Sequence, residues 1–147
     1  MRRGPRGFTL LEIMVVLVIA AVVYLLVANV IFRGPSAYDL KTSARTLAAA
    51  LRQAQTTAMA TRRDTTLTLD VDAREYAVTG EASPHKLPEG IDLKLYTAQS
   101  EITSDRKGAI RFYPDGSSTG GRITLSVGER KYLVDVDWLT GRVSIED

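Results

Sequence analysis

The sequence predicts an α+β protein in which a long N-terminal helix, with an apolar transmembrane half and an amphipathic half, packs on an antiparallel β-sheet head of about seven strands. Three observations support this fold class. A nearly uncharged segment lies close to the N-terminus, a stretch with apolar residues at helical spacing follows it, and short segments with alternating apolar residues fill the remainder.

Composition divides the 147 residues into three parts. We expect residues 1–7 to be a leader that is cleaved, residues 8–33 to be a transmembrane and assembly helix, and residues 34–147 to be one head. Glu12 is the only charged residue between Phe8 and Phe32, and residues 13–28 form an unbroken apolar run. No later segment has this composition.

The apolar segment is predicted to cross a membrane. A helix over the 25 residues from Phe8 to Phe32 is about 37 Å long, and a hydrocarbon core is about 30 Å thick. Its Ile, Leu, Val and Phe side chains favour insertion by about 5 to 10 kcal/mol in sum. An ionised Glu12 costs about 2.5 to 3.5 kcal/mol at most. Insertion therefore outweighs the cost of this carboxylate.

Three arginines precede the segment, namely Arg2, Arg3 and Arg6. By the positive-inside tendency they keep the N-terminus in the cytoplasm and place the head across the membrane. An ordinary secretory signal does not fit, because its apolar region is about 7 to 15 residues and a small-residue cleavage site follows it. Composition alone leaves a plain signal anchor as the alternative.

A short motif stands directly before the apolar run, Gly7-Phe8-Thr9-Leu10-Leu11-Glu12. With the basic leader, it resembles the cleavage motif of type IV prepilins and pseudopilins. The resemblance implies that prepilin peptidase cuts between Gly7 and Phe8 and methylates the new amino group of Phe8. A glycine suits this position because it lets the backbone approach a protease closely in an extended form.

Glu12 is the assembly residue that this resemblance implies. An ionisable side chain inside an apolar segment is a functional-site hypothesis by default. In a filament, its carboxylate would neutralise the free amino group of Phe8 on a neighbouring subunit. The alternative is a carboxylate that is tolerated near the lipid headgroups.

The head is predicted to begin with a helix break at Gly34-Pro35 and a helix over about residues 36–62. Apolar residues recur there at steps of three and four, which predicts one narrow buried face. The face consists of Leu40, Ala44, Leu47, Ala48, Leu51, Ala54 and Ala58, with Lys41, Arg45 and Arg52 outside it. Its many alanines favour close packing against a sheet or another helix.

Strands are predicted over about residues 65–146, where the apolar period becomes two. The alternating residues are Leu67, Leu69 and Val71; Tyr76 and Val78; Ile91, Leu93 and Leu95; Ile110 and Phe112; Ile123, Leu125 and Val127; Tyr132, Val134, Val136 and Trp138; Val143 and Ile145. A hairpin is expected at Asp72-Ala73. Tight turns at Gly128-Glu129 and Thr140-Gly141 make the last three strands antiparallel neighbours. We expect one or two sheets.

The head offers little for catalysis or for binding a metal or cofactor, and we expect neither an enzyme nor a cofactor. It lacks cysteine, and its one histidine, His85, is expected to be exposed in a loop. Asp135 and Asp137 are expected on the solvated face of a strand, and Trp138 in core or rim packing. With 15 Lys and Arg against 16 Asp and Glu from Gly34 onward, the formal charge of −1 makes nucleic acid an unlikely partner.

The most distinctive stretch of the head runs from Phe112 to Gly121 and is expected to form a long hairpin loop, because it lacks the ending of a phosphate-binding loop. With the following residues 122–125, it resembles the loop-and-strand signature of the H-type minor pseudopilins of type II secretion, the GspH/FimT-like family. Its candidate partner-binding residues are Asp115, Gly116, Ser117, Ser118, Thr119, Gly120 and Gly121.

The resemblance implies a structural subunit at or near the tip of the type II secretion pseudopilus, which takes part in protein secretion across the outer membrane. Implied partners are other major and minor pseudopilins, prepilin peptidase and the inner membrane. The protein would span the inner membrane once, with a periplasmic head, and then enter the periplasmic pseudopilus. The alternative is a minor pilin of a type IV pilus, for pilus assembly, adhesion or DNA uptake. A basic cluster would then form from Arg106-Lys107, Arg111, Arg122 and Arg130-Lys131.

The predicted processing can be checked on the native protein. Intact-mass and peptide mass spectrometry are expected to show the loss of residues 1–7 and a methylated Phe8. A mature protein that retains its leader in cells with prepilin peptidase would contradict the prediction.

Overall fold

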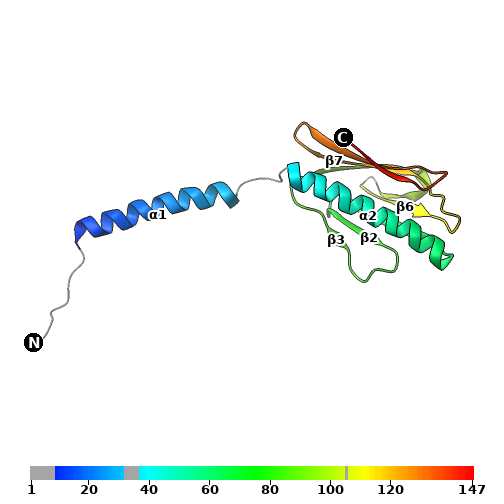
Figure 1. Cartoon of the computed structure of the whole chain (residues 1–147), viewed down its shortest axis with the longest axis horizontal. Coiled ribbons are helices and arrows are strands. Elements are labelled where there is room, and N and C mark those ends of the chain that lie inside the picture. The colour runs from blue at the N-terminus through cyan, green and yellow to red at the C-terminus, as the bar shows by residue number, and fades with distance from the viewer. Residues whose placement is uncertain (1–8, 32–36, 105) are drawn as a thin grey trace, which may run out of the picture. The chain divides into compact units, whose positions relative to one another are not determined.

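The computed structural model describes residues 9–31, 37–104 and 106–147 (Figure 1). The chain separates into two units, one up to Gly34 and one from Pro35 onward, and each is described by itself. The predicted leader and the predicted break at Gly34-Pro35 lie outside the described residues.

The first unit contains helix α1, Leu10–Ile31. Thr9 caps its start, because the Thr9 Oγ1 accepts a hydrogen bond from the Glu12 N–H at 3.2 Å. The described side chains of α1, residues 10–25, are apolar apart from Glu12 and are exposed. Among the described residues, no helix combines the length and the apolarity that a membrane span needs. The crossing by residues 8–33 stays a prediction.

The head contains helix α2, Ala37–Thr61, and, within the described residues, nine strands in two antiparallel sheets. The α+β fold class is therefore confirmed. The five-stranded sheet has the order β3-β2-β1-β6-β5, with strands His85–Lys86, Glu75–Val78, Thr65–Asp70, Lys107–Phe112 and Ile102–Ser104. The four-stranded sheet has the order β4-β7-β8-β9, with strands Asp92–Thr97, Gly121–Val127, Arg130–Val136 and Val143–Glu146.

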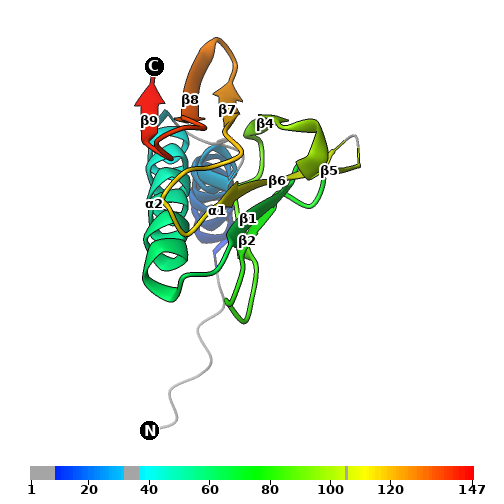
Figure 2. The ribbon, with the colours of Figure 1, turned by 90° about the vertical axis from the view of Figure 1, so that its right-hand side faces the viewer.

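The core lies between α2 and the inner faces of both sheets. Helix α2 contacts β1 and β6 of one sheet and β7, β8 and β9 of the other, and it runs alongside β8 and β9 in Figure 2. All seven residues of its predicted apolar face are completely buried. Opposite them lie the fully buried side chains of Leu67, Leu69, Ile110, Phe112, Ile123, Leu125 and Val134.

The predicted turns join the strands as expected from local sequence. Strands β1 and β2 form the hairpin at Asp72-Ala73, with Asp70 opposite Glu75. Strands β7, β8 and β9 are successive antiparallel neighbours, with Val127 opposite Arg130 and Val136 opposite Val143. A connection this short can join only antiparallel neighbours, because parallel strands need a much longer crossover.

The estimate of about seven strands is too low, because β3 and β5 are absent from the prediction. Both are edge strands of two and three residues, which is too short for a periodic pattern. The loop prediction for His85 is wrong for this reason, since His85 lies in β3 opposite Tyr76 and its ring stacks on the tyrosine ring at 5.1 Å. His85 is exposed, as expected.

Of the two alternatives predicted for Trp138, core packing is wrong, because 65 % of the residue is exposed. Strand β8 ends at Val136, and the Asp137 Oδ1 accepts hydrogen bonds from the N–H groups of Leu139 and Thr140. The turn ends the alternation of buried and exposed residues at Val136, and Trp138 therefore points outward.

The packing of α2 predicts a large effect for one of its core leucines. Leu51→Ala is expected to lower the free energy of unfolding by about 2 to 5 kcal/mol, because it removes buried methyl groups and leaves a cavity. The measurement is urea unfolding followed by circular dichroism. Thr46→Ala, on the exposed side of the same helix, is the control and is expected to change it by less than about 0.5 kcal/mol.

Candidate functional site

The N-terminal part of the predicted site is only partly described. Gly7 and Phe8, the predicted cleavage and methylation residues, lie outside the described residues. Glu12 lies in the first turn of α1, where it is exposed. Its position near the start of an apolar helix fits the role predicted for it, and that role stays a prediction.

The candidate partner loop of the head connects two different sheets. Strand β6 pairs with β1 and β5, whereas β7 pairs with β4 and β8. The stretch folds back on the end of β6 through an antiparallel bridge between Phe112 and Ser118, so a hairpin turn is present there. The prediction that a hairpin loop joins two paired strands is wrong, because the stretch as a whole is a crossover between the sheets. Sequence reasoning could not find this, because both strands show the same alternation and one partner of each, β1 for β6 and β4 for β7, is not its neighbour in the chain.

Most of this crossover faces inward. Gly116, Ser118 and Gly120 are buried, while Pro114 and Asp115 at the tip are exposed. The Ser118 Oγ donates to the carbonyl of Arg111 at 2.7 Å, and the Ser118 N–H donates to the carbonyl of Trp138 at 2.9 Å. Ser118 thus joins the crossover to the end of β6 and to the turn after β8.

The exposed tip is held by Asp115. Its Oδ1 accepts from the Ser117 Oγ at 2.6 Å and from the Ser117 N–H at 2.9 Å. These hydrogen bonds favour the ionised carboxylate and lower the pKa of Asp115 below its ordinary value. Their contribution to stability is present above the ordinary pKa of the carboxyl and is lost as the pH falls through the lowered value.

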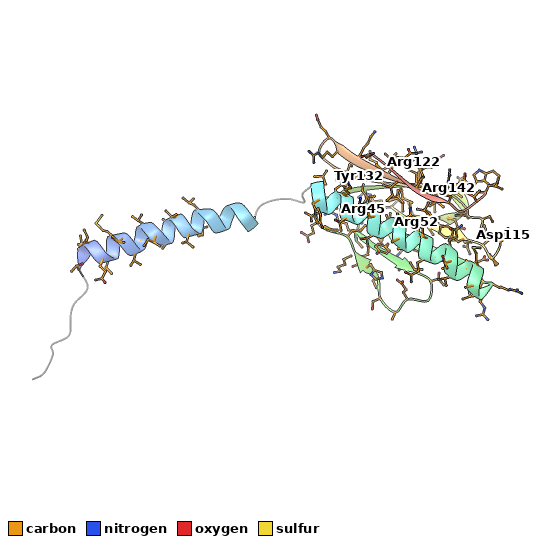
Figure 3. The ribbon with its side chains drawn as sticks, viewed as in Figure 1. Arg45, Arg52, Asp115, Arg122, Tyr132 and Arg142 are labelled. Atoms are coloured by element: carbon orange, nitrogen blue, oxygen red, sulfur yellow. The ribbon has the colours of Figure 1, made fainter. Side chains whose placement is uncertain are left out.

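Helix α2 fixes the crossover and the β8–β9 turn together through Gln55. The Gln55 Nε2 donates to the carbonyl of Gly116 at 2.8 Å and to that of Thr140 at 2.9 Å. One turn earlier, the Arg52 Nη2 donates to the carbonyl of Val143 at 3.0 Å, and Figure 3 labels Arg52 on α2. Sequence reasoning missed Gln55, because a glutamine on a helix carries no signal of such a contact.

Asp137 shapes the turn that Gln55 holds. Its Oδ1 accepts from the Thr140 N–H and the Thr140 Oγ1, both at 2.8 Å, and these bonds lower the pKa of Asp137. Gly141 follows with φ of 64°, a backbone conformation that favours glycine. A Cβ at this position would meet the carbonyl oxygen of Gly116 and the amide of Gln55. The close approach of turn, crossover and helix therefore requires a glycine.

A buried carboxylate supports the other end of the crossover. The side chain of Glu101 is only 8 % exposed and binds Arg111 in a fork, with Nε to Oε1 at 3.0 Å and Nη2 to Oε2 at 3.2 Å. The hydrogen bond to Glu101 raises the pKa of Arg111. The backbone carbonyl of Arg111 also accepts the hydrogen bond from Ser118. The ion pair of Arg111 and Glu101 therefore fixes the end of β6, to which the crossover is attached.

The basic cluster considered for DNA binding is mostly paired with carboxylates. Arg106 contacts Asp72 and Arg122 contacts Asp135, each at 2.6 Å. Lys107 lies 3.6 Å from Asp70, and Arg111 is bound to Glu101. Asp135 is therefore on the outer face, as expected, and has a partner there. Within the part of the chain that the structure describes, no three acidic or histidine side chains are grouped to hold a metal.

A helix on two antiparallel sheets, with an apolar helix before it that carries an acid in its first turn, is the architecture that the resemblance to type IV pilins and pseudopilins implies. The sequence matches the family model of type II transport protein GspH over residues 43–140 and the prokaryotic N-terminal methylation motif over residues 2–28. Because the first match covers more than half of the chain, the chain belongs to the GspH family of type II transport proteins.

Known proteins agree with this assignment. The chain is 33 % identical to type II secretion system protein H of Xanthomonas campestris pv. campestris over 142 residues, which is 97 % of this chain and 83 % of that protein. The minor pseudopilin EpsH of the Vibrio cholerae type 2 secretion system has the same fold, with a TM-score of 0.59 and 15 % identity over 74 % of this chain and 96 % of EpsH. The type IV minor pilin FimU of Pseudomonas aeruginosa has a TM-score of 0.59 and 14 % identity over 75 % of this chain and 90 % of FimU.

Two glycines provide a matched test of the contact between turn and crossover. Gly141→Ala is expected to destabilise the head by more than Gly128→Ala, measured by thermal or urea unfolding. Both residues have a positive φ, 64° and 59°, so both substitutions cost about 1 kcal/mol from the backbone. A Cβ at position 128 meets nothing within 4 Å, whereas one at 141 collides with backbone. Equal losses would contradict this explanation.

Proposed function

We propose that this chain acts at or near the tip of the type II secretion pseudopilus, as a minor pseudopilin that links other pseudopilins during protein secretion. It is a structural subunit of the GspH family, and the head presents contacts rather than a reaction centre. The observation that carries the proposal is the N-terminal methylation motif over residues 2–28, joined to a GspH-type head over residues 43–140.

Processing and assembly follow from the N-terminal segment. Prepilin peptidase would cut between Gly7 and Phe8, methylate Phe8 and leave Glu12 as the fifth residue of the mature chain. Helix α1 has apolar side chains that are exposed in the described residues 10–25. Such a surface must be kept from water. Lipid of the inner membrane would cover it first, and the helices of neighbouring subunits would cover it in the pseudopilus.

The head contributes a rigid body that is held in the periplasm. Gln55 joins α2 to both the crossover and the β8–β9 turn, and Arg111 with Glu101 fixes the end of β6. A subunit that transmits an assembly force needs such internal connections. The exposed tip at Asp115 is the part of the predicted partner loop that another subunit would reach.

A minor pilin of a type IV pilus is the alternative, and the likeness to FimU supports it as far as the fold goes. Two observations favour secretion. The Xanthomonas relative, similar over nearly the whole chain, is a type II secretion protein, and most cations of the suggested DNA-binding cluster are paired. Deleting the gene separates the two functions, because loss of exoprotein secretion supports the first and loss of twitching or DNA uptake supports the second.

The role of Glu12 can be tested in the membrane. Glu12→Ala is expected to leave insertion unchanged, since it removes only a cost, and to reduce incorporation into the filament severely. The amounts in membrane and sheared-filament fractions are compared by immunoblotting. Glu12→Asp retains the charge and serves as the partial-rescue control. Normal incorporation of the alanine variant would contradict the proposed pairing with the amino group of Phe8.

A further inference from the structure

The charges of the head are distributed unevenly between the sheets and α2. Cations on the strands are mostly paired with carboxylates, as with Lys86 and Glu75 or Arg122 and Asp135. On α2, three cations lie outside the buried face, and Asp39 is the only acid of this helix. These three cations are Lys41, Arg45 and Arg52. Among the described residues, no carboxylate forms an ion pair with any of the three.

These cations are aligned. Lys41 and Arg45 are four residues apart and Arg45 and Arg52 are seven apart, so the helical period places all three on one side over about 16 Å. Arg52 donates a hydrogen bond to the carbonyl of Val143, the residue that follows the exposed Arg142 in the chain. Figure 3 labels Arg45 and Arg52 on α2, and Arg142, which directly precedes β9. We call Lys41, Arg45, Arg52 and Arg142 the basic row.

The side chains between these cations project only a short distance from the helix. Thr42, Ala49 and Thr56 are exposed beside the row and have small side chains, while the large exposed side chains of Tyr38 and Met59 lie beyond its two ends. A partner can therefore approach the backbone of α2 closely while its own charged groups meet the arginines. Arg52 is also held in place by its hydrogen bond, so less side-chain freedom is lost on binding.

We propose that the basic row is a docking surface for a compact acidic face on another pseudopilin head, and this rests on the function proposed above. Opposite charge on the partner would steer the encounter and fix the register of the two heads. The partner would supply carboxylates spaced over about 16 Å, as on one side of a helix or across adjacent strands.

A compact acidic protein face fits better than a nucleic acid. Without the four residues of the row, the head has 11 Lys and Arg against 16 Asp and Glu, a formal charge of −5. This excess of carboxylates over the rest of the head disfavours a long phosphate backbone, which would extend beyond the row. A compact acidic patch on a protein meets only the row.

Charge reversal at Arg45 tests the proposal. The full chain carrying Arg45→Glu is produced together with the other pseudopilins, and the amount of these that co-purifies in detergent is measured at increasing NaCl. We expect about a tenfold decrease relative to the unaltered chain at about 0.15 M salt, and a steeper loss with salt for the unaltered chain than for the variant. Lys131→Glu makes the same charge change on β8, outside the row, and is expected to have no effect.

Each result has a defined meaning. Equal co-purification with Arg45→Glu, or an equal decrease with Lys131→Glu, overturns the proposal and leaves the function untouched. If the unaltered chain itself fails to co-purify with any pseudopilin, the proposed function fails as well. Thermal unfolding of the variant is expected to match the unaltered chain, because Arg45 makes no hydrogen bond or ion pair among the described residues.

A cross-linking experiment locates the contact independently. The chain has no cysteine, so Ala49→Cys, four residues after Arg45 and three before Arg52 on the exposed side of α2, places a single thiol within the row. With a short thiol-to-amine cross-linker, we expect adducts to another pseudopilin whose attached peptide lies beside an Asp- and Glu-rich surface. Glu129→Cys is the control and is expected to give none. Adducts only from position 129, or binding of a labelled DNA duplex that Arg45→Glu abolishes, would overturn the assignment.

Discussion

The close packing of α2 on two separate sheets is the constraint on which the head depends. Four alanines on the buried face bring the helix axis near the strands, and three leucines fill the space between them. Each sheet alone would expose its inner face, so the helix is what makes the two sheets one core. A larger side chain in place of any of these alanines would push the helix away from both sheets.

This closeness explains the unusual composition of the crossover. The chain must pass from β6 to β7 at the end of α2, where Gln55 and the β8–β9 turn leave little room. Glycines and a serine fit, and a Cβ on Gly120 would come within 3.0 Å of the Trp138 Cβ. The stretch that looked most like a binding loop in the sequence is therefore distinctive mainly because of internal packing. Only its tip is free to meet a partner.

The sequence predicted what depends on local spacing. The seven-residue face of α2 and the hairpins β1–β2 and β7–β8–β9 follow from period and turn residues, which neighbours in the chain determine. The crossover and the fork between Arg111 and Glu101 depend on contacts between distant residues, and no pattern in one sequence encodes them. Trp138 shows the limit clearly, since the alternation extends to it while the Asp137 turn has already ended the strand.

The charged residues fall into two groups, those that are neutralised within the subunit and those that have no ion-pair partner within it. On the strands, arginine and carboxylate are close enough to neutralise each other within the subunit, as in the fork on Glu101. On the helices the situation is reversed, because neither the Glu12 carboxylate nor the three α2 cations of the basic row form an ion pair among the described residues. Glu12 stands alone on an exposed apolar helix, and the row stands on a surface of small residues. Charges in such places cost little in an isolated subunit, since water solvates them, but they become costly when a neighbour covers them without an opposite charge. Under the two proposals above, neighbours that bring an amino group to Glu12 and carboxylates to α2 are accepted, and neighbours without these groups are rejected.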